Sequence, residues 1–100
     1  MTSERSIKNI EETALSELIE TVVVVDTEST TIFIGTLVRV ARDCLVLEDA
    51  DVHDCEQGYS GKELYVVNAR MHGFTPNREK VYIPMHKIIA ISVLDDIIVE

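Results

Sequence analysis

Residues 21–47 of the chain, TVVVVDTESTTIFIGTLVRVARDCLVL, decide its fold. Three runs rich in Val, Ile, Thr and Leu are separated by polar clusters at residues 26–30 and 41–43. Proline-free runs of β-branched residues between polar turns are typical of an antiparallel meander. Gly35 lies inside the middle run, and a glycine within a strand marks a bulge or a sharp bend. The stretch therefore predicts a strongly bent sheet of short strands, as in a small barrel.

The middle run, residues 31–40, also predicts how its side chains divide between the faces of the sheet. Successive side chains of a strand point to opposite faces, so every second residue shares a face. One predicted face comprises Ile32, Ile34, Thr36, Val38 and Val40, and the other comprises Phe33, Gly35, Leu37 and Arg39. The uninterrupted valines at residues 22–25 predict a first strand with both faces covered.

Two further segments have the periodicity of helices. Residues 6–20 carry apolar side chains at helical spacing and predict an amphipathic helix of about three turns that covers the sheet. Residues 63–72 have two interpretations. LYVV at residues 64–67 alone would suit a strand, but the helical stripe and Gly73 favour a short helix, inserted between the third and fourth strands, that ends before Gly73. Its apolar stripe consists of Leu64, Val67 and Met71.

The final two strands are predicted at residues 80–84, KVYIP, and residues 88–94, IIAISVL. The first of them ends at a proline, which has no N–H to give to a sheet. The pair Asn77-Arg78 precedes these strands. Its side chains could stabilise a turn by hydrogen bonding, or they could contact a neighbouring subunit. The chain is thus predicted to be mainly β, with five strands and an N-terminal helix.

Length and composition indicate one soluble domain. A chain of 100 residues with 46% hydrophobic content buries roughly two-thirds of its unfolded surface. No apolar run approaches the roughly 20 residues that cross a bilayer, and residues 1–20 lack the pattern of a secretory signal. We therefore expect a cytoplasmic protein that does not bind membranes, in which Cys44 and Cys55 are free thiols.

Charge limits the kinds of partner. Acidic residues number 18 against 9 basic ones, which gives a formal net charge of -9. Uniform negative charge repels phosphate groups, so a nucleic-acid site has to be a local basic patch. The balance counts against RNA or DNA binding without excluding it.

Two segments resemble the motifs of the Sm and Sm-like (LSm) family. The first is IGTLVRVARDCLVLEDA at residues 34–50, and the second is VYIPMHKIIAIS at residues 81–92. The resemblance implies one Sm-like domain over residues 1–100, built as an N-terminal helix on a strongly bent, open five-stranded barrel of the SH3-like kind. Residues 6–20 are then the helix, 21–55 the meander, 56–79 the variable insertion, 80–94 the last two strands and 95–100 a tail.

The resemblance also implies a site for single-stranded RNA at the pore of a ring. In Sm-like proteins that bind uridine-rich RNA, an asparagine before the third strand reads the base and an Arg-Gly corner before the fifth strand holds it. Here the matching positions are Asp43 or Cys44 and Pro84-Met85, which supply neither the amide nor the guanidinium. The RNA-binding candidates are Arg42, Asp43, Cys44, Met85, His86 and Lys87. The alternative interpretation is that these are ordinary solvated loop residues.

An open five-stranded barrel leaves two strands with unpaired backbone groups, and head-to-tail strand addition between copies would satisfy both. Such a contact closes into a homo-oligomeric ring when the rotation permits. The candidate interface residues are Val81, Ile83, Ile89, Ile91 and Val93. The sequence is consistent with two functions. One is a ring that binds single-stranded RNA, and the other is a ring-forming protein-interaction scaffold without affinity for nucleic acid.

The sequence gives little support to catalysis or to a metal site. The ligand-capable side chains lack the paired spacing of metal sites, and we expect them at the surface. They are Cys44, His53, Cys55, His72 and His86. There is no nucleophile elbow, phosphate loop or zinc-protease motif. We therefore expect a protein that is not an enzyme and that needs no cofactor.

Overall fold

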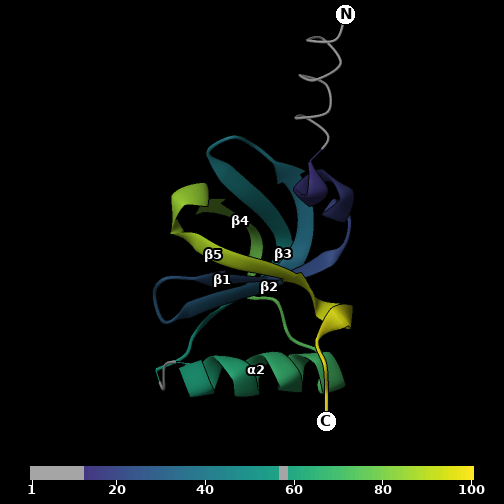
Figure 1. Ribbon diagram of the computed structural model, residues 1–100, viewed down its shortest axis with the longest axis vertical. Coiled ribbons are helices and arrows are strands. Elements are labelled where there is room, and N and C mark those ends of the chain that lie inside the picture. Colours follow the sequence, from purple (N-terminus) through teal and green to yellow (C-terminus); the bar gives the residue numbers. More distant parts are fainter. Residues whose placement is uncertain (1–12, 57–58) are drawn as a thin grey trace, which may run out of the picture.

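The computed structural model describes residues 13–56 and 59–100 of the chain. Within these residues there are five strands, one α-helix and three short 3-10 helices, arranged as in Figure 1. In chain order these are η1 (Ala14–Leu18), β1 (Val22–Thr27), β2 (Thr31–Val40), β3 (Cys44–Asp54), α2 (Tyr59–His72), β4 (Arg78–Pro84), η2 (Met85–Lys87), β5 (Ile88–Val93) and η3 (Leu94–Asp96).

All five strands form one antiparallel sheet in the order β4-β3-β2-β1-β5. The first three strands are consecutive neighbours, so the predicted meander is confirmed. Among the described residues β4 pairs only with β3, and β5 pairs only with β1. The sheet is therefore an open one with β4 and β5 at its two edges.

Gly35 is where β2 bends. A Cβ atom at this position would lie 2.8 Å from Ala50 Cβ and 2.9 Å from Ala50 Cα, so only glycine lets β3 approach this closely. The pairing of β2 with β3 shifts between Ile34 and Thr36 and again between Leu37 and Arg39. The glycine thus marks an irregularity, as the sequence predicted.

The same register shifts overturn the predicted faces of β2. Ile32 and Ile34 pack in one cluster of buried residues, whereas Leu37 and Val40 pack in or against the other. Strict alternation had placed Val40 with the two isoleucines. That prediction is wrong because an inserted residue in a bulge moves every later side chain to the opposite face.

Apolar clusters cover both faces of the sheet at β1. The first cluster consists of Val23, Val25, Leu37, Leu45, Leu47, Ala50 and Ile83. The second consists of Val24, Ile32, Ile34, Cys55, Val66, Ala69 and Leu94. The prediction that both faces of the first strand are covered is confirmed, and α2 supplies Val66 and Ala69 to the cover of the second face.

The predicted helix at residues 6–20 lies largely outside the described residues, which begin at Thr13. In the described part Ala14–Leu18 form a 3-10 helix, whose Leu15 and Leu18 pack against the first cluster. Glu20 has a φ of 75°, so the backbone turns sharply between η1 and β1. The described part of this segment is therefore not the α-helix that the periodicity predicted.

The inserted helix is present and longer than predicted. It spans Tyr59–His72 and ends before Gly73, whose φ of 86° is the left-handed conformation expected of a glycine in that place. The Gly73 N–H donates to the Ala69 carbonyl over 2.8 Å. Of the apolar stripe seen in the sequence, Leu64 and Met71 are exposed, because α2 packs through its other side.

Candidate functional site

The two sheet edges are the first candidate site. The side chains of Val81 and Ile91 are half-buried against the first cluster, while Tyr82 and Ile89 are 58% and 62% exposed. Val93 is half-buried at the end of β5. Ile83 is only 1% exposed, so its side chain belongs to the core of the chain rather than to a seam between copies, and its prediction as an interface residue is wrong. The edges therefore combine open backbone with a few large apolar side chains.

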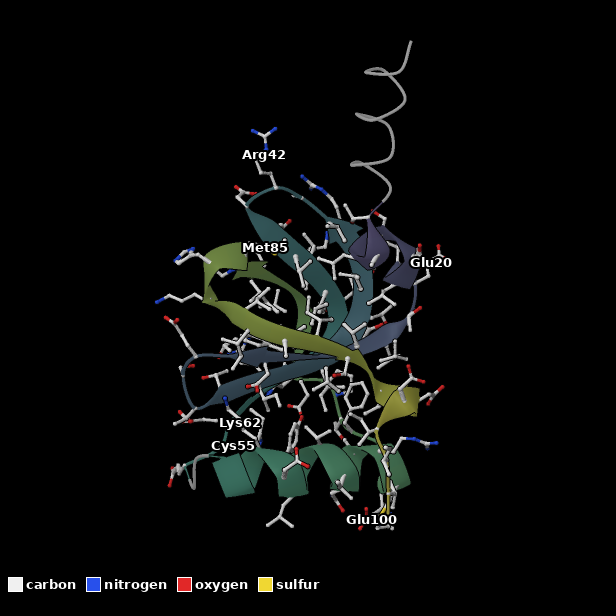
Figure 2. The ribbon with its side chains drawn as sticks, viewed as in Figure 1. Glu20, Arg42, Cys55, Lys62, Met85 and Glu100 are labelled. Atoms are coloured by element: carbon white, nitrogen blue, oxygen red, sulfur yellow. The ribbon has the colours of Figure 1, made fainter. Side chains whose placement is uncertain are left out.

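The loop end of the sheet is the second candidate site, and a backbone contact builds it. The Met85 N–H donates to the Asp43 carbonyl over 2.8 Å, and Cys44 is the strand partner of Pro84. The connection before β3 and the corner before β5 are thereby joined. Figure 2 shows Arg42 and Met85 at this end of the molecule, on the opposite side from α2. The structure thus brings together residues that the sequence only proposed as neighbours.

The side chains at the loop end differ in how available they are. Met85 is half-buried against the first cluster, so part of its side chain packs in the core and only the rest is accessible to a ligand. Partial burial raises the pKa of the Cys44 thiol, and Asp43 raises it further, so this thiol remains neutral near pH 7. Arg42, Asp43 and His86 are exposed. They are the groups that a ligand at this end would meet.

Lys87 is directed toward the turn between β1 and β2. Its Nζ atom lies 3.5 Å from Glu28 Oε1, and its carbonyl accepts the Glu28 N–H over 3.1 Å. An exposed ion pair at this distance is weak and leaves the lysine free to rearrange. Among the described residues, Arg39 and Arg42 are exposed at the loop end and form no ion pair, and Arg39 is close enough to Cys44 to lower the pKa of its thiol in part. His86 is an exposed imidazole at the same end.

A groove of about 370 Å³ lies between the β1–β2 turn and the end of β4. Phe33 and Ile83 are apolar parts of its lining, and the Glu28–Lys87 pair stands beside them. The complete lining is Thr27, Glu28, Ser29, Thr31, Phe33, Ile83, Pro84 and Lys87. Sequence reasoning missed this groove because its walls come from two segments that are fifty or more residues apart and share no local pattern.

A buried lysine fixes α2 to the sheet. Lys62 Nζ donates to Asp26 Oδ1 over 2.6 Å, to the Thr27 carbonyl over 3.0 Å and to the Ser29 carbonyl over 2.6 Å. Its side chain is 11% exposed, and a charge so enclosed is stable only with such partners. Figure 2 shows Lys62 between α2 and the sheet. No signal in the sequence distinguishes this lysine from a surface one.

A second polar contact joins α2 to β3. The Tyr65 hydroxyl donates to Asp51, and the Tyr65 ring stacks on His53 with centroids 4.1 Å apart. Burial raises the pKa of Tyr65, and the hydrogen bond to Asp51 raises it further. His53 and Asp51 therefore serve to hold the helix.

The ligand-capable side chains do not gather into a metal centre. No group of three or more His, Cys, Asp or Glu residues in the described part of the chain is placed to hold a metal ion. Cys44 and Cys55 are free thiols, as predicted. Cys55 was expected at the surface, and that prediction is wrong because the residue packs in the second cluster at 4% exposure. None of the helices in residues 13–56 and 59–100 has the length and hydropathy to span a bilayer.

Comparison with solved structures identifies the fold. A Pyrococcus abyssii Sm protein in complex with a uridine heptamer has a TM-score of 0.54 and 20% identity, over 79% of this chain and 90% of that chain. A chain of the NatC complex bound to Gag peptide and CoA has a TM-score of 0.52 and 18% identity, over 79% and 89%. A chain of the NatC complex bound to CoA has a TM-score of 0.54 and 17% identity, over 81% and 84%.

By sequence alone, the chain matches no family model and no curated protein. The structural likeness is therefore one of fold. The protein has an Sm-like fold, with five antiparallel strands in an open sheet and a helix between β3 and β4 among the described residues.

Proposed function

We propose that this chain is a non-enzymatic Sm-like module that assembles head to tail with copies of itself into a ring. One observation carries the proposal, which is that the sheet ends in β4 on one side and β5 on the other. Each edge presents a row of backbone N–H and C=O groups that seek partners. The β4 edge of one copy and the β5 edge of the next satisfy each other.

The side chains at the edges support this pairing. Tyr82 and Ile89 are large and exposed, and burial of such groups favours association. Val81, Ile91 and Val93 are half-buried and would complete their burial at the seam. Because one edge differs from the other, the contact is heterologous and generates a closed ring or a filament rather than a two-fold dimer.

The ring would present its loop ends to single-stranded RNA. The joined segments at Asp43 and Met85 carry the exposed side chains of Arg42 and His86. A ring repeats this weak site once per subunit, so several contacts act along one strand of RNA. The complex of the Pyrococcus abyssii Sm protein with a uridine heptamer supports RNA as the ligand class.

A protein-interaction scaffold without affinity for nucleic acid is the second candidate function. The net charge of -9 favours it, as does the acidic Asp43 in the place of a base-reading amide. Two of the structural neighbours are chains of the NatC complex, which in one structure is bound to Gag peptide and CoA.

Native mass spectrometry at micromolar concentration tests the assembly. We expect one dominant species at a whole-number multiple of the 11.2 kDa chain. A strictly monomeric spectrum at these concentrations would contradict the ring.

A titration with uridine-rich and adenine-rich oligonucleotides at low and moderate salt tests the ligand. RNA binding should weaken as salt rises, because bound counterions are released from phosphate. Replacement of Arg42 and His86 by alanine should weaken binding, whereas Arg70→Ala, which removes an exposed cation from α2, should not. No binding at low salt would remove RNA from the proposal and leave the scaffold.

A further inference from the structure

We propose that the cleft between β5 and α2 is the docking site for β4 of a second copy, which it receives in one orientation selected by charge. Tyr82 of the incoming strand lies against Ala90, and its basic start lies opposite Asp95 and Asp96. This inference rests on the proposed ring, since it specifies how the two edges meet, and it makes α2 part of the seam.

The cleft lies where β5 carries small side chains. Ala90 and Ser92 face Lys62, Glu63 and Val66 of α2 across a space of about 110 Å³. The remaining lining residues are Val24, Asp26, Ile32 and Ile97. Both Ala90 and Ser92 are exposed in the chain, although they stand on a strand whose inward residues are isoleucine and valine. Small outward residues leave room for a larger side chain from a neighbouring strand.

Strand pairing determines which side chains of β4 can reach this cleft. Ser92 lies opposite Val24 of the second cluster, so the outward residues of β5 are on the α2 side of the sheet. On β4, Val81 and Ile83 lie opposite Leu47 and Leu45 of the first cluster.

Tyr82 and Lys80 of β4 therefore point to the other face. An added strand keeps the faces of the sheet that it extends, because inward and outward side chains must match across the seam. Tyr82 of one copy then falls on the α2 side of the next copy, level with Ala90 when the two strands overlap along their full length. The exposed tyrosine ring meets small side chains there.

Charge selects the orientation of the incoming strand. Antiparallel addition places the start of β4, with Arg78 and Lys80, opposite the end of β5, which Asp95 and Asp96 follow. Parallel addition would instead place these cations beside Lys87. All four groups of the antiparallel pairing are exposed. Opposite charges across a seam fix orientation, and like charges penalise the alternative.

Contacts within the chain hold the side chains of Arg78 and Lys80 only weakly, so both remain available to a second copy. Lys80 Nζ lies 3.8 Å from Glu48 Oε2, with both side chains about half exposed, and such pairs are weak in water. Arg78 donates to the carbonyl of its neighbour Asn77 over 3.0 Å. The intervening Glu79 alternates to the opposite face of β4. A second copy is thus the partner of matching chemistry, because both halves of the contact occur on one chain.

Charge reversal with complementation tests the orientation. One variant carries R78E and K80E, and the other carries D95K and D96K. Each alone should lose the ring, because like charges then meet at every seam. An equal mixture should assemble again, in species with an even number of subunits that alternate between the variants. The variant R70E, which lowers the net charge by two on the exposed side of α2 and away from the seam, should assemble like the natural chain.

The outcomes separate this inference from the ring itself. A monomeric natural chain would overturn both. If the natural chain assembles and the two reversed variants assemble as well as it does, the ring stands and the charge-selected seam is wrong. Circular dichroism of each variant verifies that it is folded.

Changes in side-chain size at Tyr82 and Ala90 test the docking of the tyrosine in the cleft, independently of the charges. Tyr82→Ala should weaken association about tenfold or more, since truncation of a central aromatic anchor has the largest effect at an interface. Ala90→Trp should fill the cleft and weaken association similarly. Leu64→Ala, which removes an exposed side chain from the outer side of α2, should change nothing. Unchanged association in both cleft variants would contradict the docking of Tyr82.

Discussion

The faces of the sheet are covered by side chains of the same chain, whereas each edge strand has a hydrogen-bonded neighbour on one side alone among the described residues. Both faces at β1 are covered by apolar clusters, and buried polar contacts from Lys62 and Tyr65 fix α2 over one of them. The edges β4 and β5 have no second strand among the described residues. The difference teaches that the faces of the sheet at β1 are covered within one chain, whereas the outer backbone groups of β4 and β5 are not paired with a strand among the described residues. Changes at the faces should therefore alter stability, and changes at the edges should alter assembly.

Gly35→Val should have the largest effect on stability. The new side chain would meet Ala50 Cα and Cβ at less than 3.0 Å, and the resulting shift of β3 should lower the free energy of unfolding by about 3 kcal/mol. Urea denaturation of the diluted protein measures the loss. Adding Ala50→Gly removes the Cβ contact alone and should recover only part of it. A variant as stable as the natural chain would show that β2 and β3 are not held this close.

Lys62→Met should be next in size. It leaves the Asp26 carboxylate, whose side chain is 28% exposed, without its cation and lowers the free energy of unfolding by about 2 kcal/mol. Lys87→Met provides the matched control, because it removes an exposed pair whose contribution is about 0.5 kcal/mol or less. Equal losses in the two variants would mean that Lys62 does not anchor α2.

Tyr65→Phe should cost about 1 kcal/mol through the lost hydrogen bond to Asp51. Burial raises the pKa of Tyr65 above the value of about 10 found in unfolded chains. The unfolded state then loses its proton first, so stability is fully present below pH 10 and falls as the pH rises further. The fall should be shallower in Tyr65→Phe, as measured by denaturation between pH 7 and pH 11. Identical slopes would contradict the buried position of this hydroxyl.

Ile89→Lys should have the smallest effect on the single chain, within about 0.5 kcal/mol, because the side chain is 62% exposed. Its effect on assembly should be large, since it places a charge in an apolar seam. Sedimentation velocity at micromolar concentration should show loss of the ring, while Leu64→Lys on the outer side of α2 leaves it intact. Equal assembly of both variants would place the contact elsewhere on the molecule.

Local patterns in the sequence predicted the strands well. Thr31–Val40 was located in full, because a proline-free β-branched run lies between two polar turns. The bend at Gly35 and the corner at Met85–Lys87 also followed from residue type. The faces of β2 beyond Leu37 did not, since a bulge depends on the partner strand and leaves no mark in composition.

The candidate site was predictable only in part. Its loop end followed from the motif resemblance, and the structure joins it through the Asp43 carbonyl and the Met85 N–H. The burial of Lys62 and the outward direction of Leu64 depend on how α2 lies over the sheet. Periodicity states that a helix has an apolar side, but here the buried side includes a lysine whose three oxygen partners come from the β1–β2 turn.

Amide hydrogen exchange of β4 and β5 at two protein concentrations tests most directly whether the edges pair between copies. The outward N–H groups of both strands should exchange more slowly at micromolar concentration than in a dilute sample, while those of the central strand β2 exchange equally in both. Exchange of β4 and β5 that is fast and independent of concentration would contradict the account.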